Sequence, residues 1–361
     1  MSEWRECNLG DVVTFQRGFD ITQDKQVSGK YPVISSSGIK SFHNEFKVDG
    51  PGVVIGRKGT LGSVFYIDSD YWPHDTSLWV KNFHGNHPRF IYYFIKVLDL
   101  GQYDVGSSNP TLNRNHIHQL PILFPYLDEQ KAIASVLSSL DDKIDLLHRQ
   151  NKTLEAMAET LFRQWFVEQA QEDWDERPLS GIADFLNGLA CQKFPPQNDI
   201  EKLPVLKIKE LSNGISEASD WAASTVKPQY IVEAGDVIFS WSASLIVKVW
   251  DGEKCVLNQH LFKVTSGEFP KWFYLLWCKH HLAEFISISS SHATTMGHIK
   301  RGDLDTAMVS VPPPNVLVEM TAVMAPLLDK QIENSKQLKG LEKLRDTLLP
   351  KLMSGEVRVA V

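Results

Sequence analysis

Two long stretches of the chain carry apolar residues in alternating steps of three and four, which is a heptad pattern. This spacing places one apolar stripe along a helix and requires a partner helix to cover it. We expect the first helix to begin at Asp128, whose carboxylate can cap free N–H groups of the first turn. Asn151 on the stripe would fix the register of the pairing at some cost in stability. The first stripe comprises Leu137, Leu140, Ile144, Leu147, Asn151, Leu154, Ala158, Leu161 and Trp165.

The second stretch follows three prolines at residues 312–314, with Asn315 as its expected cap. Its stripe carries Arg345 where the first has Ala158, and otherwise consists of Leu338, Leu341, Leu348 and Leu352. The simplest arrangement packs the two helices on each other as an antiparallel coiled coil. An ordinary helical hairpin inside one core is the alternative.

The remaining sequence predicts two globular blocks that mix strands and helices. Short apolar runs at residues 63–67, 77–80, 237–239 and 245–250 are typical of strands bounded by Gly, Ser and Asp. Phe90, Tyr93, Phe94 and Val97 recur at the spacing of a helix with one buried face. The fold class is therefore α+β.

The chain is an internal duplication. Trp4, Leu9, Phe15 and Gly18 recur as Trp174, Leu179, Phe185 and Gly188. Residues 52–55 match 235–238, and the predicted helix at 90–94 matches 272–276. We therefore expect two blocks, 1–127 and 174–314, each followed by a helical segment, 128–173 and 315–361. Such a repeat favours two blocks joined by paired helices over the simple hairpin.

Composition narrows the class of protein. A chain of 361 residues with 43% hydrophobic and 22% charged residues exceeds a single domain. Its net charge of −7 is unusual for a nucleic-acid binder, but residues 128–173 hold 5 basic and 10 acidic side chains, so much of the acidity lies in the predicted spacer. Scattered cysteines, no signal peptide and no apolar run long enough for a membrane span predict a cytoplasmic protein.

Four segments resemble the specificity subunits of type I restriction–modification systems. Residues 154–166 (LEAMAETLFRQWF) and 344–356 (LRDTLLPKLMSGE) resemble the ends of that family's central and C-terminal conserved helices. Residues 128–133 (DEQKAI) resemble the start of its first helix, and residues 56–62 (GRKGTLG) resemble a loop of its target recognition domains. The second half departs from this pattern at 315–319 (NVLVE) and 239–244 (FSWSAS).

The resemblance implies a function without catalysis by this chain. Each block would be a target recognition domain that reads one half of a bipartite double-stranded DNA sequence. The helices would act as a ruler and dock two methyltransferase subunits, and restriction (motor-nuclease) subunits would join them. This chain would bind no cofactor: S-adenosylmethionine belongs to the methyltransferase, and ATP and Mg²⁺ to the restriction subunits.

Residues that could contact DNA lie in polar loops of both blocks. Arg57 and Lys58 lie between glycines, and an arginine can pair with guanine O6 and N7. The other candidates are Ser36, Lys40, His43, Asn109, Thr111, Asn113 and Arg114 in the first block, and Lys207, Lys209, Ser240, Trp241, Ser242, Thr294, Thr295, His298 and Lys300 in the second. Lys207 and Lys209 are the exception to the loop position, because they follow the apolar start of a strand and alternate outward. Solvated turns or core positions are the alternative for each of them.

Phe162, Trp165 and Phe166 thicken the apolar face near the end of the first helix. They would either dock the methyltransferase or be buried against a recognition domain.

Motifs for catalysis are missing from the sequence. There is no phosphate-binding GxxxxGK[ST] loop, residues 109–112 (NPTL) lack the rest of an adenine methyltransferase motif, and the histidines show no metal-ligand spacing. We therefore expect no metal site. Two other classes stay open: a methyltransferase or nuclease with its own recognition domains, and a coiled-coil scaffold that binds no DNA.

Overall fold

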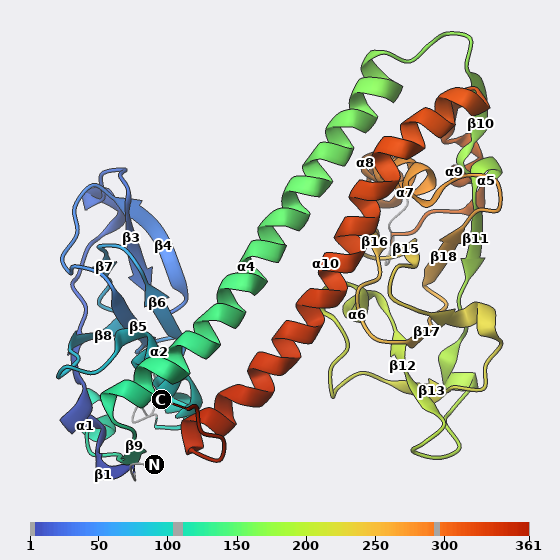
Figure 1. Ribbon diagram of the computed structural model, residues 1–361. Coiled ribbons are helices and arrows are strands. Elements are labelled where there is room, and N and C mark those ends of the chain that lie inside the picture. Colours follow the sequence, from blue (N-terminus) through green and yellow to red (C-terminus); the bar gives the residue numbers. More distant parts are fainter. Residues whose placement is uncertain (1–3, 104–110, 292–296, 361) are drawn as a thin grey trace. The chain divides into compact units, whose positions relative to one another are not determined.

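The computed structural model describes residues 4–103, 111–291 and 297–360 (Figure 1). The chain divides into two compact units, Met1–Lys143 with Leu341–Val361, and Ile144–Gly340. Each unit holds one globular block and a part of both long helices. The domain boundaries expected from the sequence stay predictions. No helix among the described residues is long and apolar enough to cross a membrane.

The first block alternates short strands and helices. Its elements are β1 (Arg5–Asn8), α1 (Leu9–Val12), β2 (Thr14–Arg17), β3 (Tyr31–Ser35), β4 (Gly38–His43), β5 (Gly52–Gly56), β6 (Val64–Ile67), β7 (Trp72–Pro73), β8 (Ser77–Asn82), α2 (Pro88–Val97), α3 (Arg114–Ile117) and β9 (Pro121–Phe124).

The second block repeats this order with additions. Its elements are β10 (Asp175–Pro178), α5 (Leu179–Ile182), β11 (Asp184–Asn187), β12 (Lys202–Leu206), α6 (Ile208–Asn213), β13 (Trp221–Ala223), β14 (Ile231–Val232), β15 (Val237–Ser240), β16 (Ile246–Val249), β17 (Cys255–Leu257), β18 (Leu261–Thr265), α7 (Lys271–His280), α8 (Leu282–Ser291), α9 (Arg301–Thr306) and β19 (Met308–Val311).

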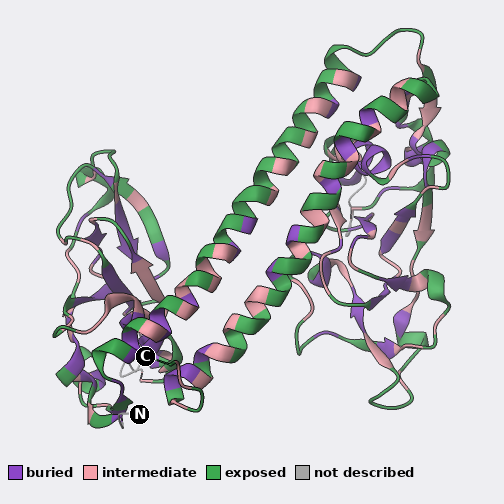
Figure 2. Cartoon of the chain, viewed as in Figure 1, coloured by how far each residue is buried: buried purple, intermediate pink, exposed green. Residues whose placement is uncertain are grey.

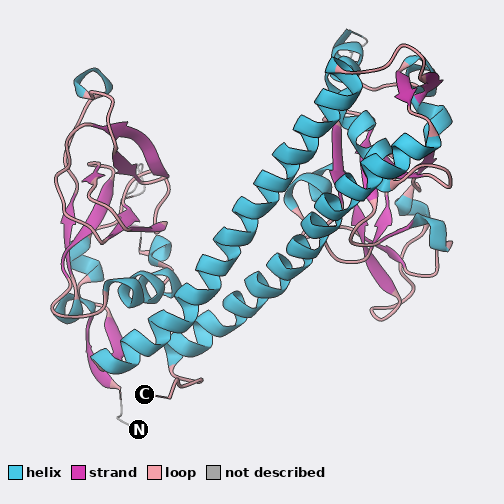
Figure 3. Cartoon of the chain, turned by 45° about the horizontal axis from the view of Figure 1, so that its top comes forward, coloured by secondary structure: helices cyan, strands magenta, loops and turns pink. Residues whose placement is uncertain are grey.

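The strand order confirms the duplication. The sheet β2-β8-β5-β6 of the first block corresponds to β11-β18-β15-β16 of the second, and all these pairs are antiparallel. The parallel pair β3·β7 corresponds to β12·β17, and β1·β9 to β10·β19. Figure 3 shows that the strands lie within the two blocks and that the segments between them are helical. The expected α+β class is confirmed.

One match inferred from the sequence is wrong by one residue. Residues 52–55 were matched to 235–238, but Gly56 pairs with Ser77 as Ser240 pairs with Leu261, so Ile55 corresponds to Phe239. The reason is that Gly235 lies in a turn before its strand with φ at +103°, whereas Gly52 is the first residue of β5. A shift of one residue matters, because it moves every side chain to the opposite face of the sheet.

The helix α2 shows how the apolar pattern produces a local element. His87 accepts a hydrogen bond from Phe90 N at 3.4 Å, and Pro88 occupies the first helical turn, where its missing N–H costs nothing. Phe90, Tyr93 and Phe94 are buried as expected, while Val97 is exposed at 38%. The buried side chains join the main core of the first unit (Figure 2).

The two long helices are α4 (Leu127–Arg163), continued by a π-helical turn at Gln164–Glu168, and α10 (Pro314–Ser354). Each of the nine residues of the first stripe, eight in α4 and Trp165 in the π-helical turn, is buried or half-buried, as the heptad pattern predicts. Both expected caps are wrong, because the helices begin before Asp128 and before Asn315. The antiparallel arrangement of the helices along their full length stays a prediction.

The first turn of α4 is held by buried polar side chains. Glu129 is 4% exposed, and its carboxylate accepts a hydrogen bond from Trp4 Nε1 at 2.9 Å and from Arg358 Nη2 at 2.7 Å. Gln130 donates to Pro125 O at 3.0 Å and accepts from His87 N at 3.0 Å. The Glu-Gln pair that marks the family resemblance therefore anchors the helix to the first block.

Within the second unit, a polar layer joins α4 to α10. Asn334 is fully buried and donates to Asn151 Oδ1 at 2.9 Å, while Asn151 donates to Ser335 Oγ at 3.2 Å. Gln331 donates to the Asn151 carbonyl at 3.2 Å. These bonds can form only in one register of the two helices, which agrees with the role expected for Asn151.

The polar layer predicts a strong coupling between its two asparagines. Asn334→Leu should lower the free energy of unfolding by about 1–3 kcal/mol, because it leaves the Asn151 Oδ1 atom without its donor in a partly buried position. Adding Asn151→Leu should recover most of that loss, since an apolar pair then replaces the unsatisfied oxygen. Urea unfolding of the wild type, both single variants and the double variant measures this, and purely additive losses would contradict it.

Candidate nucleic-acid interface

A loop at the end of β5 is clamped by backbone hydrogen bonds in the first unit. Arg57 N donates to Thr76 O at 2.9 Å, and Leu112 N donates to Arg57 O at 3.0 Å. Lys58 forms an isolated antiparallel bridge with Thr111. Ser36 approaches from the β3–β4 turn, where its N–H donates to Thr76 Oγ1 at 3.3 Å. Three loops that are distant in the sequence therefore converge at Arg57 and Lys58.

Charged side chains gather beside this loop. Arg17, the last residue of β2, donates from Nη2 to Asp75 Oδ2 at 2.9 Å. The other carboxylate oxygen of Asp75 lies 3.0 Å from His74 Nδ1. Burial, together with the nearby charge of Arg17, lowers the pKa of the Arg57 guanidinium, and Asp75 partly offsets that shift. Lys58 is exposed.

The second unit repeats the backbone of this loop with different side chains. Trp241 N donates to His260 O at 3.4 Å, and Ile299 N donates to Trp241 O at 3.0 Å. Ser242 forms an isolated antiparallel bridge with His298. Trp241 therefore corresponds to Arg57, Ser242 to Lys58, His260 to Thr76 and His298 to Thr111.

The side chains of this second loop are neutral polar and aromatic groups. Trp241 Nε1 donates to Asn187 Oδ1 at 3.1 Å, and Ser242 Oγ lies 3.1 Å from His260 Nδ1. The Trp241 ring lies 5.8 Å from the His260 ring and 6.4 Å from the His298 ring. A groove of about 330 Å³ adjoins the loop, lined by Gln192, Lys207, Ile208, Lys209, Asn258, Gln259 and His260.

Comparison with known proteins identifies the duplicated architecture. The chain matches the family described as type I restriction modification DNA specificity domain over residues 1–156 and 171–343. The chain belongs to this family. It is 28% identical over 299 residues to the type I restriction enzyme MjaIX specificity subunit of Methanocaldococcus jannaschii, covering 75% of this chain and 69% of that protein. It is 19% identical over 460 residues to the HindI specificity subunit of Haemophilus influenzae, covering 99% of this chain and 100% of the relative.

A solved structure shows the same fold. The type I restriction–modification S subunit from M. genitalium superposes with a TM-score of 0.69 at 14% identity, covering 97% of this chain and 96% of that one. Together with this fold, the family match and the named relatives, which carry the assignment, show that the chain is a type I specificity subunit with two recognition domains. Subunits of this kind recognise DNA and carry no catalytic function, so a methyltransferase or nuclease with its own recognition domains is excluded.

In the first recognition domain of this specificity subunit, the structure brings four of the predicted DNA-contacting residues together: Ser36, Arg57, Lys58 and Thr111. Asn113 caps α3 by accepting from Asn115 N at 3.0 Å, and Arg114 is exposed in its first turn. Lys40 is exposed on β4, and no contact joins it to this group. Asn109 lies outside the described residues.

His43 is a correction. It is only 5% exposed, its Nδ1 lies 3.0 Å from both the N and the O of Val27, and its ring packs against Trp72 at 5.4 Å. The prediction was wrong because His43 lies on the inner face of a short strand, where its ring forms a hydrogen bond with the backbone of Val27 instead of facing solvent.

In the second recognition domain, Trp241, Ser242 and His298 lie together, and Lys207 and Lys209 line the adjoining groove. Lys207 pairs with Asp220, and Lys209 lies on α6, not on the strand expected from the alternating pattern. Lys300 is exposed, and its N–H donates to Asp303 Oδ2 at 2.6 Å. Thr294 and Thr295 lie outside the described residues.

Ser240 is a second correction. Its side chain is fully buried and donates to the carbonyls of Ser242, at 3.2 Å, and Ser244, at 2.8 Å. The hydroxyl therefore shapes the loop and cannot reach DNA.

The predicted docking patch at the end of α4 is also corrected. Phe162 and Phe166 are each 5% exposed and pack in the main core of the second unit, with Trp277 at 5.0 Å and 5.5 Å respectively. Trp165 is half-buried against the same core. These aromatic side chains fasten the helix to the recognition domain, which was the alternative left open by the sequence.

Sequence reasoning missed several residues beside the two loops. Arg17 and Asn187 occupy equivalent positions, each directly before the repeated glycine, Gly18 or Gly188. The sequence could have pointed to these two residues, because the glycine is the same in both copies of the repeat while the residue before it differs. Asp75 and His260 were missed because they follow short strands with no motif of their own.

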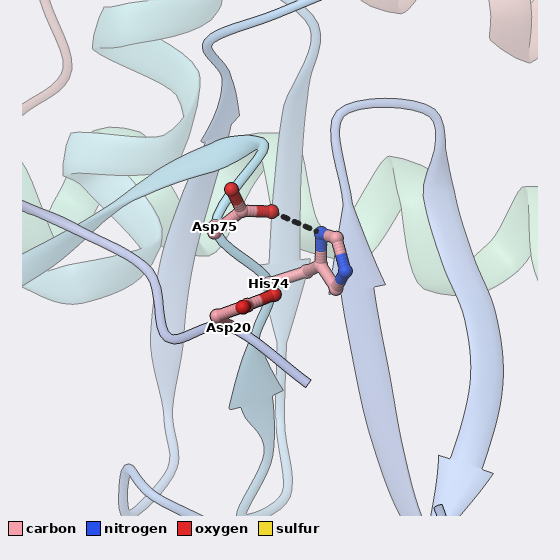
Figure 4. Close-up of side chains that lie close together, drawn as sticks. All are labelled: Asp20, His74 and Asp75. Carbon is pink, nitrogen blue, oxygen red and sulfur yellow. Dashed lines mark ion pairs between the residues drawn. The ribbon is translucent and has the colours of Figure 1, made fainter. Parts of the chain in front are cut away.

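One group among the described ranges has the composition of a metal site. Asp20, His74 and Asp75 each offer a ligand atom within 4.8 Å of the other two (Figure 4). The expectation of no metal site overlooked this group, because Asp20 is distant in the chain from His74 and Asp75. Arg17 already neutralises Asp75, and His74 Nδ1 contacts Asp75 and Thr76 Oγ1. We therefore assign the cluster to the charge network around Arg17.

The shared loop conformation predicts opposite effects at one equivalent position. Gly59 and Ala243 both have positive φ, +82° and +55°, a region that costs a non-glycine residue about 1–2 kcal/mol. Gly59→Ala should lower the free energy of unfolding by about 1 kcal/mol, because alanine is strained at this positive φ. The loss should not be larger, since the new methyl group meets only Ser36 Oγ, at 3.6 Å. Ala243→Gly should stabilise the second domain slightly. Urea unfolding of both variants measures this, and a destabilised Ala243→Gly would show that the loops differ.

Proposed function

We propose that this specificity subunit recognises a bipartite double-stranded DNA target, with one half-site read by each recognition domain. The observation that supports this is the loop frame that the two domains share. Backbone hydrogen bonds fix the same loop in both, while the side chains at equivalent positions differ: Arg57 and Lys58 in one, Trp241 and Ser242 in the other. A common frame with different side chains suits two readers of different sequences.

Contacts with phosphates position a protein on DNA, whereas contacts with base edges discriminate sequence. Lys58, Arg114, Lys209 and Lys300 are exposed cations suited to phosphates. Arg57, Thr111, Trp241, Ser242 and His298 lie at the clamped loops and are suited to base edges. Asn113 and Lys207 lie beside these groups, at the N-cap positions directly before α3 and α6.

The proposal includes partners that the family names imply. Two methyltransferase subunits would dock on this chain, restriction subunits would join them, and the long helices would set the distance between half-sites. This chain would bind no cofactor of its own: S-adenosylmethionine would be held by the methyltransferase, and ATP with Mg²⁺ by the restriction subunits. Since Phe162 and Phe166 are buried, docking must use other surfaces of the chain.

The test is a genome-wide map of methylated adenines in cells that express the cognate methyltransferase subunit with or without this chain. We expect a two-part motif with a fixed unread gap that disappears when this chain is omitted. A continuous motif, or methylation that does not depend on this chain, would contradict the proposal and favour the scaffold that binds no DNA.

A further inference from the structure

The clamped loop of the first recognition domain carries a charge arrangement that the second lacks. Arg17 and Arg57 lie beside Asp75 in the first domain. The equivalent residues of the second domain are Asn187, Trp241 and Gln259, and none of them is charged. The backbone around the central residue is shared, because Arg57 and Trp241 each donate to and accept from the equivalent loops, so the charges differ through the side chains.

The contacts of Asp75 leave Arg57 as the cation without a partner. One carboxylate oxygen of Asp75 accepts from Arg17 at 2.9 Å, and the other lies 3.0 Å from His74. The Arg57 guanidinium has neither an ion pair nor a hydrogen bond with any described residue, and its Nη1 is buried without a partner. Donors of the Arg57 guanidinium are therefore unused, although the side chain lies at a strand end beside a second arginine. An acceptor from outside the chain would satisfy them.

The neighbouring charges indicate which acceptor fits. Asp20 is exposed and lies with Asp75 and His74 within 4.8 Å (Figure 4). Arg17 compensates the charge of Asp75, so Asp20 is the carboxylate of this group that would repel a phosphate, whereas a neutral base edge does not meet this repulsion. Guanine presents O6 and N7 in the major groove, two acceptors that match the fork of an arginine.

We propose that Arg57 reads a guanine in the half-site of the first recognition domain, and that Asp75 is the positioning residue that holds Arg17 beside it. The inference rests on the proposed function and names the base for one of its two readers. Asp75 neutralises Arg17 and fixes its side chain, so that two guanidinium groups can lie next to each other. Burial and the charge of Arg17 lower the pKa of Arg57, and Asp75 offsets that shift only in part, in keeping with the absence of an ion pair to Arg57 among the described residues.

The experiment maps methylated adenines with the cognate methyltransferase subunit for the wild type and four variants. Arg57→Lys keeps the charge but loses the fork, and should lower the preference for guanine at one position of one half-site by about tenfold. Asp75→Asn should relax the same position, and Asp75→Glu should preserve it. Gln259→Asn, at the matched position of the second domain, should leave that guanine unchanged.

The outcomes separate this inference from the function on which it rests. A wild-type motif with two parts, whose half altered by Arg57→Lys contains no guanine, would overturn the inference and leave the proposed function intact. Absence of a two-part motif would overturn the proposed function itself. Methylation of the unaffected half-site reports correct assembly of each variant. If Asp75→Asn fails to assemble, Arg57→Lys still decides whether Arg57 reads guanine.

Discussion

The central constraint in this molecule is that the polar backbone of a partly buried loop must be satisfied from within the chain. In each domain one residue at the end of a central strand donates its N–H to a carbonyl of a second loop and accepts from an N–H of a third. Buried backbone groups rarely go without a partner, so this clamp persists whatever side chain the residue carries. The same loop therefore forms with Arg57 in one domain and with Trp241 in the other. Recognition can vary while the scaffold stays constant.

The long helices depend on a different balance. The two helices, of 37 and 41 residues, are stabilised mainly by burial of their apolar stripe residues, because helical propensity alone contributes little stability in water. Apolar stripes tolerate several registers, and the bonds between Asn151 and Asn334 select one. Arg345, which interrupts the second stripe, pairs with Asp141 at 3.2 Å, so its charge is compensated within the first unit. The recognition domains are fastened to these helices by buried groups such as Glu129 and Phe166.

The sequence predicted the elements of this fold better than its functional site. Periodicity reveals α2 and both long helices because burial of one face imposes a spacing that is visible in the chain, and the duplication reveals the two domains. The site depends on loops that meet only after folding: Asp75 and Arg17 are brought together by pairing of β2 with β8, which no local pattern encodes. His43 and Ser240 were wrongly predicted to contact DNA because they are polar, whereas both are buried and form hydrogen bonds with backbone groups inside the domain. Caps were wrong because proline allows α10 to begin one residue before Asn315.

The claim that two equivalent loops read one half-site each is tested most directly by substituting the matched residues Arg57 and Trp241 with alanine, one at a time. Each variant is expressed with the cognate methyltransferase subunit, and methylated adenines are mapped across the genome. We predict that Arg57→Ala relaxes or abolishes recognition in one half of the motif, that Trp241→Ala does so in the other half, and that the unread gap keeps its length. Changes by both variants in the same half, or equal loss in both halves from either variant, would contradict the account.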